Sequence, residues 1–204
     1  MLEIRGLKYS YAKERVIQYP EFMVSNGEIL RVNGPSGSGK STLLQLLAGL
    51  ITGYSGDIFF AGRAYSDYKK PLFKSGKLGY VAQTPLLLKN MPINFSFGLD
   101  NWKLKTSEDR EWIAEMITIF KMEKELNKYP DELSLGQAMR AQIISVFANA
   151  HRLLLLDEPT ASLDDDNVEG FMQLLKLYQS KFNPVVVMVS HDNRVRGYSN
   201  SIEL

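Results

Sequence analysis

The hydrophobic residues of this chain fall into short unbroken runs and longer periodic stretches. Residues 153–156 and 185–189 are unbroken apolar runs that do not alternate with polar positions. Such runs are typical of strands buried on both faces in the middle of a parallel sheet. Residues 28–33 and 78–82 also have the length and composition of strands. Because helical segments alternate with these strands, the pattern predicts an α/β protein with a mostly parallel sheet.

Three other stretches have the spacing of helices. Residues 41–50 and 134–150 each combine an apolar stripe with polar positions. Residues 108–120 form a more strongly amphipathic segment. The apolar stripe of this last segment consists of Trp112, Ile113, Met116, Ile117 and Phe120. We therefore expect helices at all three places.

After Gln83 the alternation of strands and helices gives way to a mainly helical pattern, and this change predicts how the chain is organised. We expect one domain over residues 1–204, with a core from 1–83 and 149–204 and an inserted helical subdomain at 84–148. With 204 residues and 45% hydrophobic content, the chain is long enough to bury a full core.

A glycine-rich loop between the strand at 28–33 and the helix at 41–50 matches the pattern G-x-x-x-x-G-K-[ST]. Glycines let successive amides turn toward a phosphate chain, and the helix N-terminus adds its partial positive charge. Lys40 supplies a charge for the terminal phosphates, and the Ser41 hydroxyl is placed to bind Mg²⁺. The alternative is a simple turn capped by Ser38. The candidate nucleotide-binding residues are Gly34, Pro35, Ser36, Gly37, Ser38, Gly39, Lys40, Ser41 and Thr42.

Two acids, Asp157 and Glu158, end the apolar run at 153–156. Ligands of open α/β sheets bind in the crevice outside the carboxyl ends of the strands, which is where this strand delivers both carboxylates. The alternative is that the two acids cap the next helix, a common use of acids before Pro159 and Thr160.

A third motif, Leu-Ser-Leu-Gly-Gln at residues 133–137, opens the helix at 134–150. Together with the glycine-rich loop and the acid pair, it resembles the ATP-binding cassette (ABC) family over essentially the whole chain. That family implies a P-loop ATPase core with a mostly parallel sheet, an N-terminal antiparallel β subdomain and an inserted helical subdomain. It also implies that two copies sandwich ATP between the loop of one and the third motif of the other. The family usually has glycine where this chain has Leu135.

The resemblance assigns further roles, with ATP and Mg²⁺ as the implied ligands. It makes Asp157 the Mg²⁺-linked aspartate, Glu158 the general base for the attacking water, and Gln83 a sensor of Mg²⁺ and that water. His191 matches the histidine that contacts the γ-phosphate, and Asp164 matches a loop that crosses the dimer interface. The motif residues implied to contact the partner's nucleotide are Ser134, Gly136 and Gln137.

An aromatic residue at the end of the first strand is expected to stack on adenine. Tyr9 and Tyr11 share a face of that strand, and the family's placement at the strand end favours Tyr11. Stacking of a base on an aromatic ring contributes about 1–3 kcal/mol. Val16 is either an apolar neighbour of the ribose or a residue packed beneath the sheet.

The composition of the chain limits the classes of partner and the location that it can have. The formal charge of +1 gives no basic field for nucleic acid, and there is no cysteine for disulfide or thiol chemistry. No apolar run approaches the 18 residues of a membrane span, and the first ten residues lack the apolar core of a signal peptide. We therefore expect a cytoplasmic protein without direct membrane insertion. The resemblance implies that it is held at the inner face of the cell membrane by integral permease subunits and pairs with a second ABC subunit, as a homodimer.

Three functions fit these motifs. The favoured one is the ATPase subunit of a membrane transporter. The second is an ABC ATPase that drives a non-transport assembly, as in cell division or iron–sulfur cluster building. The third, a nucleic-acid factor, is disfavoured because such relatives carry two cassettes or a long coiled coil. Prolines interrupt the apolar stretch from Gln83 to Trp102, so some of its side chains should form an exposed patch; the alternative is that all of them fill the core of the subdomain. The resemblance implies that a short helix of the permease docks here, with Leu88 and Met91 as rim residues.

Overall fold

The structure is a computed structural model that describes residues 1–11, 16–68, 72–99, 106–195 and 200–204. Trp102, the end of the apolar stretch expected to face a partner, lies outside these residues. Within the described residues, no helix combines the length and apolarity needed to cross a membrane.

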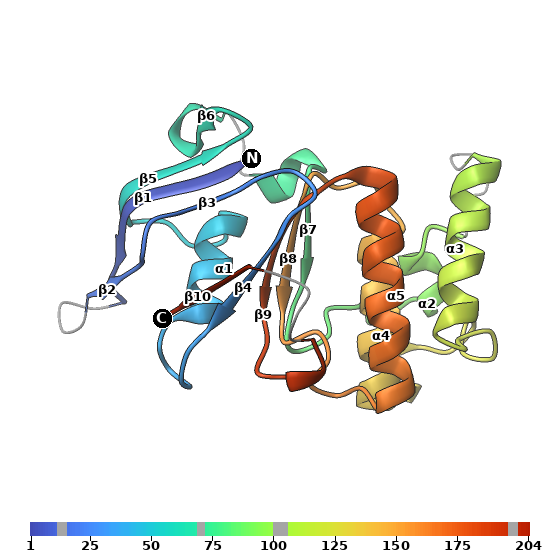
Figure 1. Cartoon of the computed structure of the whole chain (residues 1–204). Coiled ribbons are helices and arrows are strands. Elements are labelled where there is room, and N and C mark those ends of the chain that lie inside the picture. Colours follow the sequence, from blue (N-terminus) through green and yellow to red (C-terminus); the bar gives the residue numbers. More distant parts are fainter. Residues whose placement is uncertain (12–15, 69–71, 100–105, 196–199) are drawn as a thin grey trace. The chain divides into compact units, whose positions relative to one another are not determined.

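One sheet has five strands, in the order β10-β4-β9-β8-β7 (Figure 1). Its strands are β4 Ile29–Asn33, β7 Leu78–Val81, β8 Leu153–Asp157, β9 Val185–Val189 and β10 Asn200–Glu203. Strands β10, β4, β9 and β8 run parallel to one another. All residues of β8 and β9 are buried, as their unbroken apolar sequences predict. Strand β10 is the one element of this sheet that the sequence did not predict.

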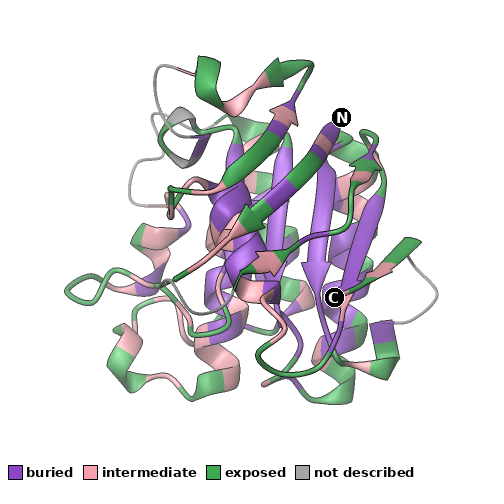
Figure 2. Ribbon diagram, turned by 90° about the vertical axis from the view of Figure 1, so that its left-hand side faces the viewer, coloured by how far each residue is buried: buried purple, intermediate pink, exposed green. Residues whose placement is uncertain are grey.

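The N-terminal part of the chain forms a second, antiparallel sheet, in which β1 pairs with β2, β3 and β5, and β5 pairs with β6. Its strands are β1 Leu2–Tyr9, β2 Ile17–Gln18, β3 Phe22–Val24, β5 Ser55–Phe60 and β6 Arg63–Ala64. Alternate residues of β1, including Leu2 and Ile4, are buried. They pack with residues of β4 and of the first helix in one apolar core. Figure 2 shows the strands of the parallel sheet largely in the colour of buried residues.

The helices are α1 Lys40–Ala48, α2 Ile93–Ser96, α3 Ser107–Ile119, α4 Leu135–Phe147 and α5 Asp165–Phe182. Local signals set their ends. Helix α1 stops at Gly49, whose φ of 73° is left-handed and whose N–H bonds back to the last turn. Helix α3 starts with a capping box between Thr106 and Asp109. Helix α4 ends at Phe147 rather than at residue 150, because the chain must turn there toward β8.

The chain divides into two compact units by its internal contacts. The first contains residues 1–80, 151–158 and 182–204, and the second contains 81–150 and 159–181. In the second unit, the Trp112 indole donates a hydrogen bond to the carbonyl of Phe147 at 2.8 Å, and Tyr178 packs against both rings. These contacts join α3, α4 and α5 in the core of this unit.

Candidate functional site

The glycine-rich loop joins β4 to α1, and the helix begins at Lys40. Its N-cap, Gly39, has a left-handed φ of 105°, and no side chain caps the helix. A Cβ at Gly39 would lie 3.0 Å from Ile17 and 3.2 Å from the Tyr19 hydroxyl, so only glycine fits. The alternative of a turn capped by Ser38 is therefore wrong. Because the first amides of a helix have no intrahelical partner, they remain available to an anion.

The side chains of the loop add further donors. The Ser38 hydroxyl is buried and, within the described part of the chain, has no hydrogen-bond partner. The Lys40 ammonium donates to the carbonyls of Gly34 and Pro35, each at 2.8 Å. Since an ammonium has three donors, one remains for a phosphate oxygen. The loop is thus a cradle of unused donors, which suits a phosphate chain.

Asp157 lies at the end of β8, directly opposite the start of α1. The Ser41 hydroxyl donates to its Oδ1 at 3.2 Å, and the Tyr80 hydroxyl lies 3.5 Å from its Oδ2. Burial raises the pKa of the Asp157 carboxyl, and the neighbouring charge of Glu158 raises it further, against the opposing effects of Ser41, Tyr80 and Lys40. A buried carboxylate next to a hydroxyl is a fitting partner for a hard cation.

Glu158 is bound to the segment that follows β9. Its carboxylate accepts the His191 backbone N–H at 3.1 Å, and its Oε1 lies 3.5 Å from His191 Nε2. The backbone of Glu158 is left-handed, with a φ of 49°, a conformation that costs a non-glycine residue of the order of 1–3 kcal/mol and that clusters at functional sites. Helix α5 begins only at Asp165, so the acid pair does not cap it and that alternative is wrong.

Tyr11 and Tyr9 differ in their surroundings. The Tyr11 side chain is 66% exposed, and its hydroxyl lies 2.8 Å from the Thr42 hydroxyl at the start of α1. Tyr9 packs partly against the apolar core, with its ring edge-on to Tyr11 at 4.9 Å between centroids. The open ring above the phosphate loop is therefore that of Tyr11. Val16 is 64% exposed, so it does not pack beneath the sheet.

The Leu-Ser-Leu-Gly-Gln motif lies in the second unit, at the start of α4. Ser134 is the N-cap, and it forms a reciprocal capping box with Gln137 at 3.3 and 2.9 Å. Leu135 is 61% exposed. A Cβ at Gly136 would lie 3.0 Å from the carbonyl oxygen of Ser162, so the first turn of α4 packs tightly against the backbone of Ser162 and leaves little room for a side chain.

Hydrogen bonds connect α4 to the loop that carries Asp164. Arg140 donates to the carbonyl of Phe120 and to the Asn167 side chain, both at 2.9 Å. Asn167 in turn donates from its backbone and its amide to Asp164 at 2.9 and 2.7 Å. The motif helix and the Asp164 loop are thus one hydrogen-bonded arrangement within the second unit.

Gln142, on α4, is a residue that the sequence reasoning missed. It is 2% exposed, and its amide nitrogen donates to the carbonyl of Ala82 at 2.9 Å. Its amide oxygen accepts the Leu86 N–H at 2.8 Å and lies 3.4 Å from the Ala82 nitrogen. These bonds hold the backbone on both sides of Gln83. The signal in the sequence was a lone amide within the apolar stripe of this helix.

A groove in the second unit lies between the segment that follows Gln83 and the Leu-Ser-Leu-Gly-Gln motif, and the expected rim residues Leu88 and Met91 are not among its lining residues. It has a volume of about 350 Å³ and is lined by Pro85, Leu87, Lys89, Pro130, Leu133, Leu135 and Ala138. Leu88 and Met91 are 55% and 44% exposed, whereas Ile93 and Phe97 of the same stretch are buried. The apolar stretch is thus divided between a core and an exposed surface.

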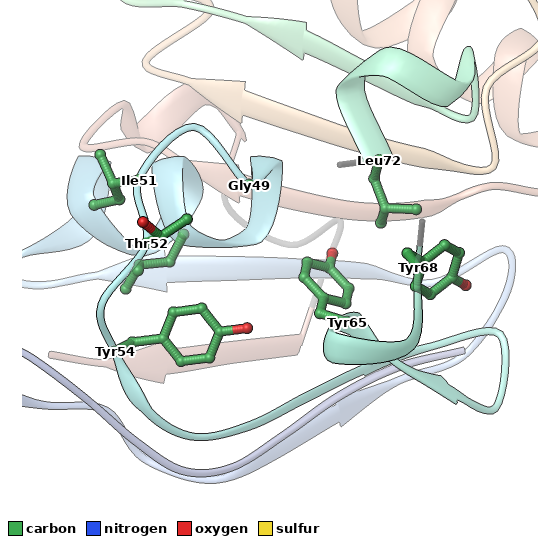
Figure 3. A pocket seen from close by; sticks show the side chains of 8 residues that line it. Gly49, Ile51, Thr52, Tyr54, Tyr65, Tyr68 and Leu72 are labelled. Carbon is green, nitrogen blue, oxygen red and sulfur yellow. The ribbon is translucent and has the colours of Figure 1, made fainter. Parts of the chain in front are cut away.

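Another cavity, of about 160 Å³, lies at the C-terminal end of α1, the opposite end from the phosphate loop (Figure 3). Its walls are mostly apolar and include three tyrosine rings. The hydroxyls of Tyr65 and Tyr68 already donate to the carbonyls of Leu47 and Phe60, each at 2.8 Å. The cavity therefore offers little polar chemistry and is no part of the nucleotide site.

Comparisons with known proteins agree with this geometry. The sequence model of the family described as ABC transporter matches residues 17–161. The lipoprotein-releasing system ATP-binding protein LolD of Buchnera aphidicola is 35% identical over 187 residues, covering 87% of this chain and 80% of the relative. A putative hemin import ATP-binding protein HrtA of Staphylococcus epidermidis is 31% identical, covering 94% and 88%.

Solved structures give the same result. The ATP-binding cassette MJ0796, solved as a dimer in a post-hydrolysis state with ADP and Pi, superimposes with a TM-score of 0.83 at 27% identity. The likeness covers 100% of this chain and 94% of that structure. An ATP-binding subunit of an ABC transporter has a TM-score of 0.86 at 22% identity, which supports the fold.

Proposed function

Because this chain belongs to the ABC transporter family of ATP-binding proteins, we propose that two copies of it close on ATP, hydrolyse it and drive an integral membrane permease. The α/β fold, with its parallel and antiparallel sheets, and the ATPase activity predicted from sequence are confirmed. The relatives are named as ATP-binding proteins of a lipoprotein-releasing system and of hemin import, which favours transport over the non-transport assembly also considered from the sequence. The observation that supports the site best is the meeting of Ser41, Asp157, Glu158 and His191 beside the phosphate loop.

In this proposal the chain's own groups divide the work of hydrolysis. The loop amides, Ser38 and Lys40 hold the β- and γ-phosphates, since each has donor capacity left. Glu158 takes a proton from the attacking water, and His191, held beside that carboxylate, contacts the γ-phosphate. Gln142 holds the backbone of Ala82 and Leu86, on both sides of Gln83, which the resemblance assigns to sensing the same water.

Mg²⁺ fits the donor set of the first unit. Ser41 and Asp157 present hard oxygen ligands 3.2 Å apart, and the resemblance adds Gln83. Among the described residues, no group of three or more His, Cys, Asp or Glu side chains is arranged to hold a metal. This suits an ion that keeps waters and takes its other ligands from the substrate's phosphates. When bound, Mg²⁺ neutralises charge on the β- and γ-phosphate oxygens.

The motif on α4 supplies the other half of each site in a homodimer. Ser134 and the amide of Gly136 stand at a helix N-terminus, where an anion is favoured. Gln137 is held by the capping box, and Asp164 by Asn167, so the proposed dimer-facing loops are ordered before ATP binds. Leu135, exposed between them, contacts the partner's nucleotide region.

The exposed apolar surface of Leu88 and Met91 is the proposed docking site for a short helix of the permease. Exposed apolar side chains of this kind are a common mark of a protein interface. The chain would thereby lie at the inner face of the cell membrane through its partner, without inserting itself. The permease, a separate chain, would select the cargo.

A mixing experiment tests the shared site. Lys40→Ala removes the phosphate contact and Ser134→Arg blocks the motif, so each variant alone should be inactive. Random pairing of the two gives heterodimers with one intact site, and up to about a quarter of wild-type ATPase activity should return. The control mixes Lys40→Ala with Lys40→Ala/Ser134→Arg, which forms no intact site. Activity that stays at the control level would reject the shared site.

A further inference from the structure

Arg31 is a buried cation in the middle of the parallel sheet. It lies on β4, is 6% exposed, and its backbone pairs with Met188 of β9. Side chains alternate along a strand, so Arg31 points to the face opposite Leu30 and Val32, which pack in the apolar core. Among the residues that the structure describes, no carboxylate forms an ion pair with the guanidinium. A buried cation without a counter-charge is costly unless hydrogen bonds compensate it.

The guanidinium bonds to the two carbonyls that flank His191. Its Nε and Nη2 donate to the Ser190 carbonyl at 3.1 and 2.8 Å. Nη2 also lies 3.3 Å from the Asp192 carbonyl. Bonds from a charged donor are roughly twice as strong as neutral ones, and the planar guanidinium fixes their directions. Arg31 therefore holds the backbone on both sides of His191.

Other bonds hold the same segment from its outer side. The His191 N–H reaches Glu158 at 3.1 Å, and the Asp192 N–H donates to the Ser190 hydroxyl at 3.0 Å. The Asp192 carboxylate accepts bonds from Arg194 at 2.7–3.0 Å. Together with Arg31, these bonds hold the backbone of His191 between a strand of the sheet and the Glu158 carboxylate.

We propose that Arg31 is a positioning residue that holds His191 against Glu158 for ATP hydrolysis. The inference rests on the proposed catalytic role of His191, and Arg31 acts through that residue. The position tolerates a buried charge because the two carbonyls need a fixed donor, which an apolar side chain cannot provide.

Arg31→Met keeps the aliphatic stem and removes the donors. Misplacing a reacting group by about 1 Å can cost 10²-fold in rate, so we expect kcat to fall by about 10- to 100-fold while the KM for ATP stays within about twofold. Arg31→Lys, which keeps the charge but replaces the planar guanidinium with a compact ammonium, should give an intermediate kcat. Ile29→Ala is the matched control, because Ile29 is buried on the same strand and has no bond to residues 190–192. It should lower Tm without lowering kcat.

A double-mutant comparison separates positioning from general stability. In a His191→Ala background, Arg31→Met should cause little further loss of kcat, because its effect passes through the missing side chain. If Arg31→Met slows the His191→Ala enzyme as much as it slows the wild type, the inference is overturned.

A measurement without turnover completes the test. The chain has two histidines, so histidine-selective isotope labelling gives NMR ring signals from His151 and His191 alone. Folded Arg31→Met should shift or broaden the His191 signals and leave those of His151 in place; unchanged His191 signals overturn the inference. If Arg31→Met does not fold, the same NMR comparison of the His191 and His151 signals is made with Arg31→Lys. Should His191→Ala hydrolyse ATP at the wild-type rate, the catalytic role of His191 fails, while the NMR result still decides whether Arg31 positions it.

Discussion

Replacing Tyr11 tests the adenine contact most directly. Its ring is 66% exposed above the phosphate loop, so Tyr11→Ala removes a stacking surface without opening the core. Stacking of a base on an aromatic ring contributes about 1–3 kcal/mol, which corresponds to a rise of about 5- to 150-fold in the Kd for ATP. Tyr11→Phe keeps the ring but loses the 2.8 Å bond to Thr42. Because one hydrogen bond contributes about 0.5–1.5 kcal/mol, that Kd should rise by about tenfold or less.

Isothermal titration with two ligands distinguishes stacking from damage to the phosphate loop. Tyr11→Ala should weaken the binding of ATP but not the binding of inorganic tripolyphosphate, which has no base to stack. Tyr9→Phe, which keeps the ring that lies edge-on to Tyr11, is the matched control and should bind both ligands as the wild type does. The reasoning is refuted if Tyr11→Ala binds ATP normally, or if it loses tripolyphosphate to the same extent.

The remaining predictions concern three buried polar residues. Burial raises the pKa of Asp157, so its ionised form is disfavoured in the folded state. At neutral pH, Asp157→Asn should therefore raise the Tm of the nucleotide-free protein, and it should abolish hydrolysis. That gain in Tm should shrink as the pH falls through the pKa of folded Asp157. The prediction is contradicted if the wild type and Asp157→Asn have the same Tm at every pH. Glu158→Gln should retain ATP in equilibrium binding but slow single-turnover hydrolysis by about 10²–10⁴-fold, and a wild-type rate would reject the base. Gln142→Leu leaves the Leu86 amide without its partner, so the free energy of unfolding measured in urea should fall by about 1–3 kcal/mol. Hydrogen exchange at residues 82–86 should become faster, and unchanged exchange would count against this prediction.

Much of the fold was predictable because its signals are local or periodic. The apolar runs that became β8 and β9 have no polar position to place on a solvent face, so they had to be buried strands. The stripe on α3 likewise marked its buried face. Strand β10 was missed because Asn200–Glu203 is mostly polar and exposed. Only its pairing with β4, far away in the sequence, makes it a strand.

For the site, the sequence was enough to locate the phosphate loop, the acid pair and the motif on α4, since each is a short segment whose chemistry depends on adjacent residues. The tertiary structure showed that Tyr11, which the resemblance already favoured over Tyr9, presents the open ring, and it brought Glu158 and His191 together. It alone revealed Arg31 and Gln142, whose partners lie 159 and 60 residues away along the chain. A lone polar residue in an apolar segment carries no signal of its partner, because that partner is a backbone group brought close by the packing of distant strands and helices.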